Sequence, residues 1–315
     1  MSEQFHHIPV LAEGVLEHLT FPEGRKVRMI DGTLGGGGHS ALLLAKYPEL
    51  ELLGIDRDEF ALKNAAEKLA FASNRVHLCH GEYAMMKEHA LAIGWDKVDG
   101  ILLDIGVSSP QIDKPERGFS WRNEGPLDMR MDQSAEVTAG RILNFSSEEE
   151  LYRIFREYGE LRSAAKLARA VVEQRAESFF GTTADLVKLC DKTLGKSAPG
   201  KLPIPTLVFQ ALRIEVNGEL EQLSRALSAA EDILRPGGRL AVISFHSLED
   251  RIVKNFMRDA AQNCICPPGL PVCVCSHRAR FTLPVRGVIC ADKQELEANR
   301  RAACAKLRVA DRTEN

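Results

Sequence analysis

Short apolar runs alternate with stretches of helical periodicity along much of the chain. Five runs have the length and continuous apolar character of buried parallel strands: 27–30, 51–55, 75–79, 98–103 and 239–245. Four stretches carry apolar residues at the spacing of one helix face: 10–19, 39–47, 58–70 and 84–92. This βαβα alternation predicts an α/β protein with a doubly wound parallel sheet.

The alternation stops after Asp104, which indicates an insertion into the sheet domain. Residues 147–193 have apolar positions at helical spacing, typical of the core of a small helical domain. We therefore predict a core made of residues 1–112 and 203–315, with an inserted all-helical domain at 113–202 that recognises the substrate.

The two borders of the insertion have features of their own. The polar segment that follows the fourth strand contains Phe119, Trp121, Met129 and Met131, and these large apolar side chains favour an ordered loop over disorder. Beyond the insertion, one long helix is predicted from Thr206 to about residue 234, before a Pro-Gly-Gly stop.

The first predicted strand leads into a turn that contains five glycines within residues 27–40. Glycine accepts positive φ and lets backbone N–H groups approach a ligand, so this turn predicts a nucleotide-type site. Three apolar runs end in an acid, at Asp31, Asp56 and Asp104, and the carboxyl ends of parallel strands meet at one edge. Asp56 lies 21 residues after Gly35, where an acid can bind ribose hydroxyls.

Two cofactors fit such a turn. The pattern Gly36-x-Gly38-x-x-Ala41 matches the loose dinucleotide fingerprint, which keeps NAD as an alternative. Asp31 argues against it, because a pyrophosphate requires N–H donors at this place. S-adenosylmethionine carries a sulfonium and an ammonium cation, so acids at strand ends favour it. A single acid could equally cap a helix or form a turn, but these roles do not explain three acids at matching strand ends.

Composition is that of an ordinary globular protein. The 315 residues are 44% apolar and 27% charged, with a net charge of −3 at pH 7. The chain has no run of eighteen apolar residues, and its first residues lack an export pattern. We expect a cytoplasmic protein with no membrane segment and eight reduced cysteines. Residues 276–308 hold eight basic residues against three acids, so a nucleic-acid partner stays open.

Four cysteines gather within twelve residues: Cys264, Cys266, Cys273 and Cys275. They are close enough in sequence to hold one zinc ion tetrahedrally. Their C-x-C spacing is less favourable than the usual C-x₂-C, so the sequence favours packed reduced thiols and no metal.

His246 follows the last predicted strand and could carry protons, although Ser247 with Asp250 also matches a helix cap. The chain has neither a G-x-S-x-G elbow nor a P-loop, which argues against acyl hydrolysis and P-loop nucleotide hydrolysis.

Longer motifs carry a family resemblance: D-G-T-L-G-G-G-G-H-S from Asp31, L-L-D-I-G-V-S-S-P-Q from Leu102, G-P-L-D-M-R-M-D from Gly125 and I-S-F-H-S-L-E-D-R from Ile243. With them the chain resembles the bacterial 16S rRNA (cytosine-N4)-methyltransferases, the MraW or RsmH family, from His7 to about Arg308.

The resemblance implies a Rossmann-like class I methyltransferase sheet with an inserted all-helical domain. It implies S-adenosyl-L-methionine as donor, a cytidine in the decoding region of 16S rRNA as target, and the small ribosomal subunit as partner; a homodimer stays open. By motif position, the donor contacts would be Gly37, Gly38, His39, Asp56, Tyr83, Asp104 and Gln111. Tyr83 would lie against the adenine.

Two segments depart from the family pattern. Pro-Ile-Pro-Thr-Leu at 203–207 replaces a common His-Pro-Ala-Thr-Arg, and 299–304 lacks the usual Asn-Pro-Arg-Ala-Arg-Ser. These departures bear on RNA binding and leave the donor site intact.

The reaction needs a group that accepts a hydrogen bond from cytosine N4, and our hypothesis assigns Asp104 or Ser108. Phe119 or Trp121 could hold the splayed-out base, with packing as the alternative. The other function class is a ribosome-assembly factor that binds RNA and holds the donor without using it.

Overall fold

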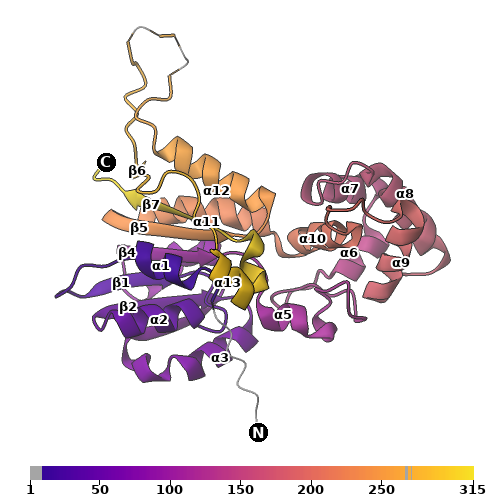
Figure 1. The fold of residues 1–315 in the computed structure, drawn as a ribbon, viewed down its shortest axis with the longest axis horizontal. Helices are drawn as coiled ribbons and strands as arrows, with labels where there is room; N and C mark the ends of the chain where they lie inside the picture. The colour runs from indigo at the N-terminus through magenta and orange to yellow at the C-terminus, as the bar shows by residue number, and fades with distance from the viewer. Residues whose placement is uncertain (1–8, 267–268, 271) are drawn as a thin grey trace. The chain divides into compact units, whose positions relative to one another are not determined.

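The computed structural model describes residues 9–266, 269–270 and 272–315, so His7, where the family resemblance begins, lies outside the described residues. The described chain divides into two compact units (Figure 1). The first contains the residues up to Gly106 and from Leu220 onward, and the second contains Val107–Glu219.

A sheet with the strand order β3-β2-β1-β4-β5-β7-β6 forms the centre of the first unit. The strands are β1 (Val27–Asp31), β2 (Leu50–Asp56), β3 (Val76–His80), β4 (Val98–Asp104), β5 (Leu234–Ser244), β6 (Phe281–Thr282) and β7 (Lys306–Arg312). The pairs among β1 to β5 are parallel, whereas β7 is antiparallel to β5 and to β6. Strand order reverses between β1 and β4, where open α/β sheets bind ligands. The predicted Rossmann-like α/β class is confirmed.

Both faces of the sheet are largely buried along β1, β2 and β4, as their continuous apolar runs predict. The prediction that the run at 75–79 is also buried is wrong, because β3 lies at the edge of the sheet and three of its five residues are exposed. In β4, Ile101 and Leu103 belong to one apolar cluster and Leu102 to the other, because successive side chains point to opposite faces. Helices of the first unit are α1 (Ala12–His18), α2 (Gly38–Lys46), α3 (Glu59–Lys68), α4 (Met86–Ala92), α11 (Glu219–Ile233), α12 (Ser247–Ala260) and α13 (Lys293–Ala298), with short 3₁₀ turns η1 (Ala70–Arg75), η2 (Tyr83–Met85) and η5 (Arg300–Cys304). α4, α11 and α12 contribute to the first cluster, and α1, α2 and α3 to the second.

The second unit is helical around its own apolar core. Its elements are α5 (Ser109–Asp113), η3 (Pro115–Arg117), α6 (Ala139–Phe145), α7 (Glu148–Arg153), the π-helical η4 (Ile154–Tyr158), α8 (Ala164–Glu177), α9 (Thr183–Leu194) and α10 (Ile204–Asn217). The sequence placed the insertion at 113–202, whereas the second unit runs from Val107 to Glu219, because Phe209 and Leu212 of α10 pack into this helical core.

Two elements differ from the sequence predictions. The prediction of a single helix from Thr206 to about residue 234 is wrong. α10 ends at Asn217, the following Gly218 has a φ of +59°, the left-handed conformation that stops a helix, and α11 then begins. β7 was not predicted, because its alternating sequence Lys-Leu-Arg-Val-Ala-Asp-Arg contains no continuous apolar run. In the described part of the chain, every helix falls short of the length and apolar character that a membrane crossing requires.

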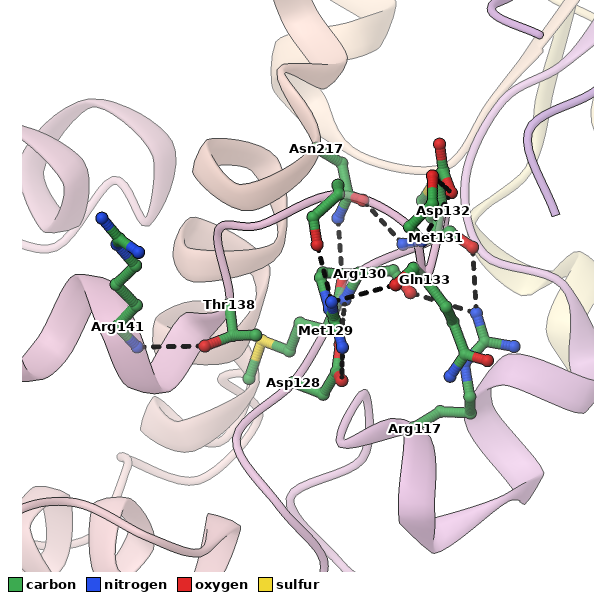
Figure 2. A network of polar contacts seen from close by, with 12 residues as sticks. Arg117, Asp128, Met129, Arg130, Met131, Asp132, Gln133, Thr138, Arg141 and Asn217 are labelled. Carbon is green, nitrogen blue, oxygen red and sulfur yellow. Dashed lines mark hydrogen bonds and ion pairs between the residues drawn. The ribbon is translucent and has the colours of Figure 1, made fainter.

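A buried amide orders the polar segment of the second unit (Figure 2). Asn217 Oδ1 accepts a hydrogen bond from the Met131 N–H, and Asn217 Nδ2 donates to the Met129 carbonyl, both at 2.8 Å. Arg117 donates to the carbonyls of Arg130 and Met131, both at 3.0 Å. Met129 has φ +61°, which a side chain rarely adopts, so these contacts hold a backbone that would not form locally.

The aromatic side chains of this segment pack within the second unit. Trp121 Nε1 donates to Thr206 Oγ1 at 3.0 Å, and both Phe119 and Trp121 lie against the helical core. Of the two roles that the sequence left open for them, packing therefore has direct structural support.

Replacing Asn217 with alanine is expected to lower the free energy of unfolding of the second unit by about 2–4 kcal/mol, because the Met131 N–H and the Met129 carbonyl lose a buried partner. The exposed Asn123 of the same segment provides the control, and Asn123→Ala should change stability by less than about 0.5 kcal/mol. Calorimetric melting of the whole chain measures both variants. Equal melting temperatures would contradict the role given to Asn217.

Candidate functional site

The glycine turn joins β1 to α2 at the carboxyl edge of the sheet. Asp31 ends β1, and Gly37, with φ +72°, is the residue before α2. The Gly35 N–H donates to Asp56 Oδ2 at 2.7 Å, so the acid that ends β2 anchors the turn. Asp56 Oδ1 also accepts from the Asp58 N–H at 2.8 Å. Burial raises the pKa of Asp56, since the charged form loses solvation.

Two glycines of the turn have different surroundings. A Cβ on Gly37 would lie 3.3 Å from a Leu69 side-chain carbon and would have to adopt positive φ, so glycine is required there for packing and conformation. A Cβ on Gly36 would meet no atom of the described residues within 4 Å. The turn is therefore closed against α3 and its following turn, and open at Gly36.

Asp31 is buried beneath the same turn. Its Oδ2 accepts from the Ser40 hydroxyl at 2.6 Å and its Oδ1 from the Thr33 N–H at 3.2 Å. Desolvation raises the pKa of Asp31 from its usual 3.8 to about 6, although the bond from Ser40 and the nearby His39 favour the charged form. The sequence signal for Asp31 was its place at a strand end, and the partner Ser40 was not anticipated.

His39 and Asp104 carry buried polar atoms that have no hydrogen-bond partner among the described residues. His39 is 7% exposed, and its Nε2 lies 3.6 Å from Asp104 Oδ2. Neither ring nitrogen of His39, nor Asp104 Oδ1, has a hydrogen-bond partner among the residues that the structure describes. Thr33 fixes the strand end beside them, since its Oγ1 accepts from the Asp104 N–H at 2.6 Å. A buried polar atom without a partner costs about 1–3 kcal/mol, so these atoms indicate a place for a polar ligand.

Gly38 and Tyr83 belong to the same unit. Gly38 begins α2, and a Cβ there would lie 2.7 Å from Pro9 Cγ. Tyr83 follows β3 in η2, is 8% exposed, and joins the apolar cluster of one sheet face. Its Cβ lies against the start of the glycine turn, where a Cβ on Gly32 would lie 3.0 Å from it. Residue patterns alone did not point to Tyr83, whose signal is its position three residues after β3.

Ser108 and Gln111 belong to the second unit. The Ser108 N–H donates to Gln111 Oε1 at 2.9 Å, at the start of α5. Gln111 is 5% exposed. The structure thus brings together Gly37, Gly38, His39, Asp56, Tyr83 and Asp104 within the first unit, and Ser108 with Gln111 within the second.

His246 serves as a helix cap with Glu249, which differs from the Ser247–Asp250 cap that the sequence offered. The fully buried Glu249 accepts from the N–H groups of Phe245 and His246, at 2.8 and 3.2 Å, and forms an ion pair with His246 Nε2 at 3.0 Å. Asp250 instead pairs with Arg308 of β7, 2.8 Å away. Histidine is an unusual capping residue, which explains why the pattern was missed.

The sequence model of the MraW methylase family matches residues 4–313. The chain belongs to this family. "Ribosomal RNA small subunit methyltransferase H" of Syntrophotalea carbinolica is 48% identical over 309 residues, and the protein of that name from Carboxydothermus hydrogenoformans is 43% identical over 309 residues; both alignments cover 98% of each chain. Among solved structures, the N-methyltransferase NodS of Bradyrhizobium japonicum aligns with a TM-score of 0.43 and 9% identity, covering 96% of this chain and 94% of that chain.

The methyl donor of the family is S-adenosylmethionine, and the edge residues fit it. Asp56 and Asp104 place carboxylates at strand ends, which suits a ligand that carries two cationic groups. Gly36 leaves open space beside the turn, and the unpartnered atoms of His39 and Asp104 can bind polar groups. NAD, the alternative that the glycine pattern left open, is not the cofactor of a methylase.

The raised pKa of Asp31 predicts a pH-dependent stability. Between pH 3.8 and about 6 the folded state keeps a proton on Asp31 that the unfolded chain has lost, so stability decreases as pH rises through this window. The loss is on the order of 3 kcal/mol. Asp31→Asn should reduce this decrease, while Asp96→Asn, at a side chain 85% exposed, should not. Chemical denaturation at pH 4 and pH 7 measures the slopes, and parallel slopes for all three proteins would refute the assignment.

Proposed function

We propose that the protein transfers a methyl group from S-adenosylmethionine to N4 of a cytidine in the decoding region of 16S rRNA. The main support for this proposal is the 48% identity, over 98% of both chains, to a protein named as a ribosomal RNA small subunit methyltransferase. The glycine turn and the acids at the carboxyl edge of the sheet support the methyl-transfer part of the proposal. The cytosine-N4 and decoding-region parts rest on the family resemblance of the motifs.

We assign the donor site to Gly37, Gly38, His39, Asp56, Tyr83, Asp104 and Gln111. Asp56 is suited to ribose hydroxyls, because its anchored carboxylate retains lone pairs beyond the two N–H groups that it accepts. Tyr83 supplies an aromatic ring to the adenine. His39 and Asp104 supply the polar atoms that have no partner within the described chain.

When bound, S-adenosylmethionine supplies an electrophilic methyl carbon on a sulfonium centre. In the transfer, the cytosine N4 forms a bond to the methyl carbon while the bond between that carbon and sulfur breaks. The electron pair of the broken bond stays on sulfur, and one proton must leave N4. The N4 lone pair is conjugated into the ring, so an acceptor that holds an N4 hydrogen makes it a better nucleophile. Asp104 Oδ1 is our first choice of acceptor, because it is buried and has no hydrogen-bond partner among the described residues. Ser108 is our second choice.

The second unit is proposed to recognise the RNA, with the substrate presented in the small ribosomal subunit and the reaction in the cytoplasm. Its polar segment is held by Asn217 and Arg117 rather than by regular structure, which is typical of loops that bind ligands. The departures at 203–207 and 299–304 would then alter affinity for RNA rather than for the donor.

Small ribosomal particles lacking the modification, incubated with the protein and deuterated-methyl S-adenosylmethionine, should yield labelled N4-methylcytidine at one site by nucleoside mass spectrometry. Asp104→Asn should slow single-turnover label transfer by about a hundredfold or more at saturating donor, since an amide is a far weaker proton acceptor than a carboxylate. Ser108→Ala is the parallel variant, and full turnover in both would remove both candidates.

The wild-type result separates the two function classes. Absence of label, with donor binding intact by calorimetry, would favour the assembly-factor alternative over an enzyme. In that case Asp56→Ala should lose donor binding and keep its affinity for the RNA.

Gly36→Ala tests the open side of the turn. Because a Cβ there meets no described atom, the variant should melt within about 0.5 kcal/mol of the wild type. Its methyl group would occupy the space assigned to the donor, so donor affinity should fall about tenfold or more by calorimetry. Gly181→Ala is the control for glycine loss alone, because φ at Gly181 is not positive and a Cβ there would meet only Asp185 Oδ2, 3.8 Å away. Unchanged affinity for Gly36→Ala would place the donor elsewhere.

A further inference from the structure

The described residues of the segment 261–280, between α12 and β6, belong to no helix or strand. Figure 1 shows residues 261–266 and 272–280 extending beyond the end of α12 in the first unit. The segment's described residues expose four large apolar side chains, Ile265, Leu270, Val272 and Val274, which are 58%, 49%, 72% and 76% exposed. An apolar core therefore does not hold these residues in place.

The four thiols of this segment converge on one point. Cys273 Sγ lies 3.4 Å from Cys264 Sγ, 3.9 Å from Cys266 Sγ and 3.5 Å from Cys275 Sγ, and Cys264 and Cys275 are 3.8 Å apart. All four sulfurs lie within 4.8 Å of one another. With Zn–S bonds of about 2.3 Å, the sulfurs of a tetrahedral site are about 3.8 Å apart. The four measured separations lie close to this tetrahedral edge and far from a disulfide bond of about 2.05 Å.

Backbone N–H groups point at these sulfurs. The Cys266 N–H lies 3.4 Å from Cys264 Sγ, the Val274 N–H lies 3.4 Å from Cys266 Sγ, and the Ile265 N–H lies 3.5 Å from Cys275 Sγ. Such donors stabilise thiolates around a metal and orient them. Packed reduced thiols, which the sequence favoured, would be buried, yet Cys264 and Cys273 are exposed.

We propose that Cys264, Cys266, Cys273 and Cys275 bind one zinc ion. Four protein sulfurs complete a tetrahedral shell and leave no open position, so the site is structural and takes no part in catalysis. Zinc binding releases the thiol protons and cross-links 264–266 to 273–275, which orders a segment that has no core of its own. The proposal is independent of the donor site and of the methyl-transfer reaction.

The full-length protein, produced with zinc in the medium and purified under reducing conditions, should contain about one zinc ion per chain by plasma mass spectrometry. Cys264→Ser and Cys273→Ser, one from each arm of the segment, should each retain less than about a tenth of that zinc. Cys290→Ser is the matched control, because Cys290 is an exposed free cysteine outside the cluster, and it should retain all of it. Cobalt in place of zinc should give the intense visible absorption of a tetrahedral thiolate site.

Three outcomes would overturn the proposal. The first is metal-free protein with all eight thiols titrating as reduced. The second is a disulfide between any two of the four cysteines, found by mass spectrometry of peptides from protein that is alkylated with no reductant added. The third is zinc that stays bound in Cys264→Ser and Cys273→Ser. Support would also come from faster proteolysis within 261–280 after chelation, since this readout does not depend on methyltransferase activity.

Discussion

The hydrogen bond from the Gly35 N–H to the Asp56 carboxylate is the contact on which the candidate donor site depends. β1 and β2 are parallel neighbours, and Asp31 is paired in register with Gly54, so β2 extends two residues beyond the end of β1. That extension puts Asp56 beside the glycine turn, where its carboxylate anchors the chain as it leaves the sheet. A shift of either strand by one residue would turn the acid to the opposite face. The register of the sheet therefore sets the shape of the site.

The same edge concentrates negative charge where solvation is poor. Burial raises the pKa of both Asp31 and Asp56, which means that their ionised forms are held at a cost in stability. A cationic ligand offsets part of this cost, whereas a pyrophosphate would add to it. The position of the acids, ahead of and beside the glycines, thus separates a methyl-donor site from a dinucleotide site more firmly than the glycine spacing does.

Sequence patterns located the elements and site residues whose position follows from local apolar runs, and missed those that depend on partners distant in the sequence. The runs that became β1, β2, β4 and the end of β5 were visible because strands buried on both faces are continuously apolar, whereas β3 was located although it is an exposed edge strand. β7 was missed because it alternates, and the two-helix division at Gly218 was missed because one glycine inside a helical pattern is ambiguous. Asp56 and Asp104 were found from strand ends, but the Ser40 partner of Asp31 required the folded chain. Tyr83 and Gln111 came from family resemblance alone.

The two units order their irregular segments by different physical means. In the second unit, the segment around Met129 is held by the side-chain amide of Asn217, which works because it is enclosed and competes with little water. The described residues of 264–275 have no comparable enclosure, and their large apolar side chains face solvent. Hydrogen bonds of neutral groups are weak where water competes, so only a stronger cross-link can order such a segment. A metal ion bound by the four converging sulfurs would be such a cross-link. Disulfides are the alternative cross-link, and a reducing compartment would disfavour them.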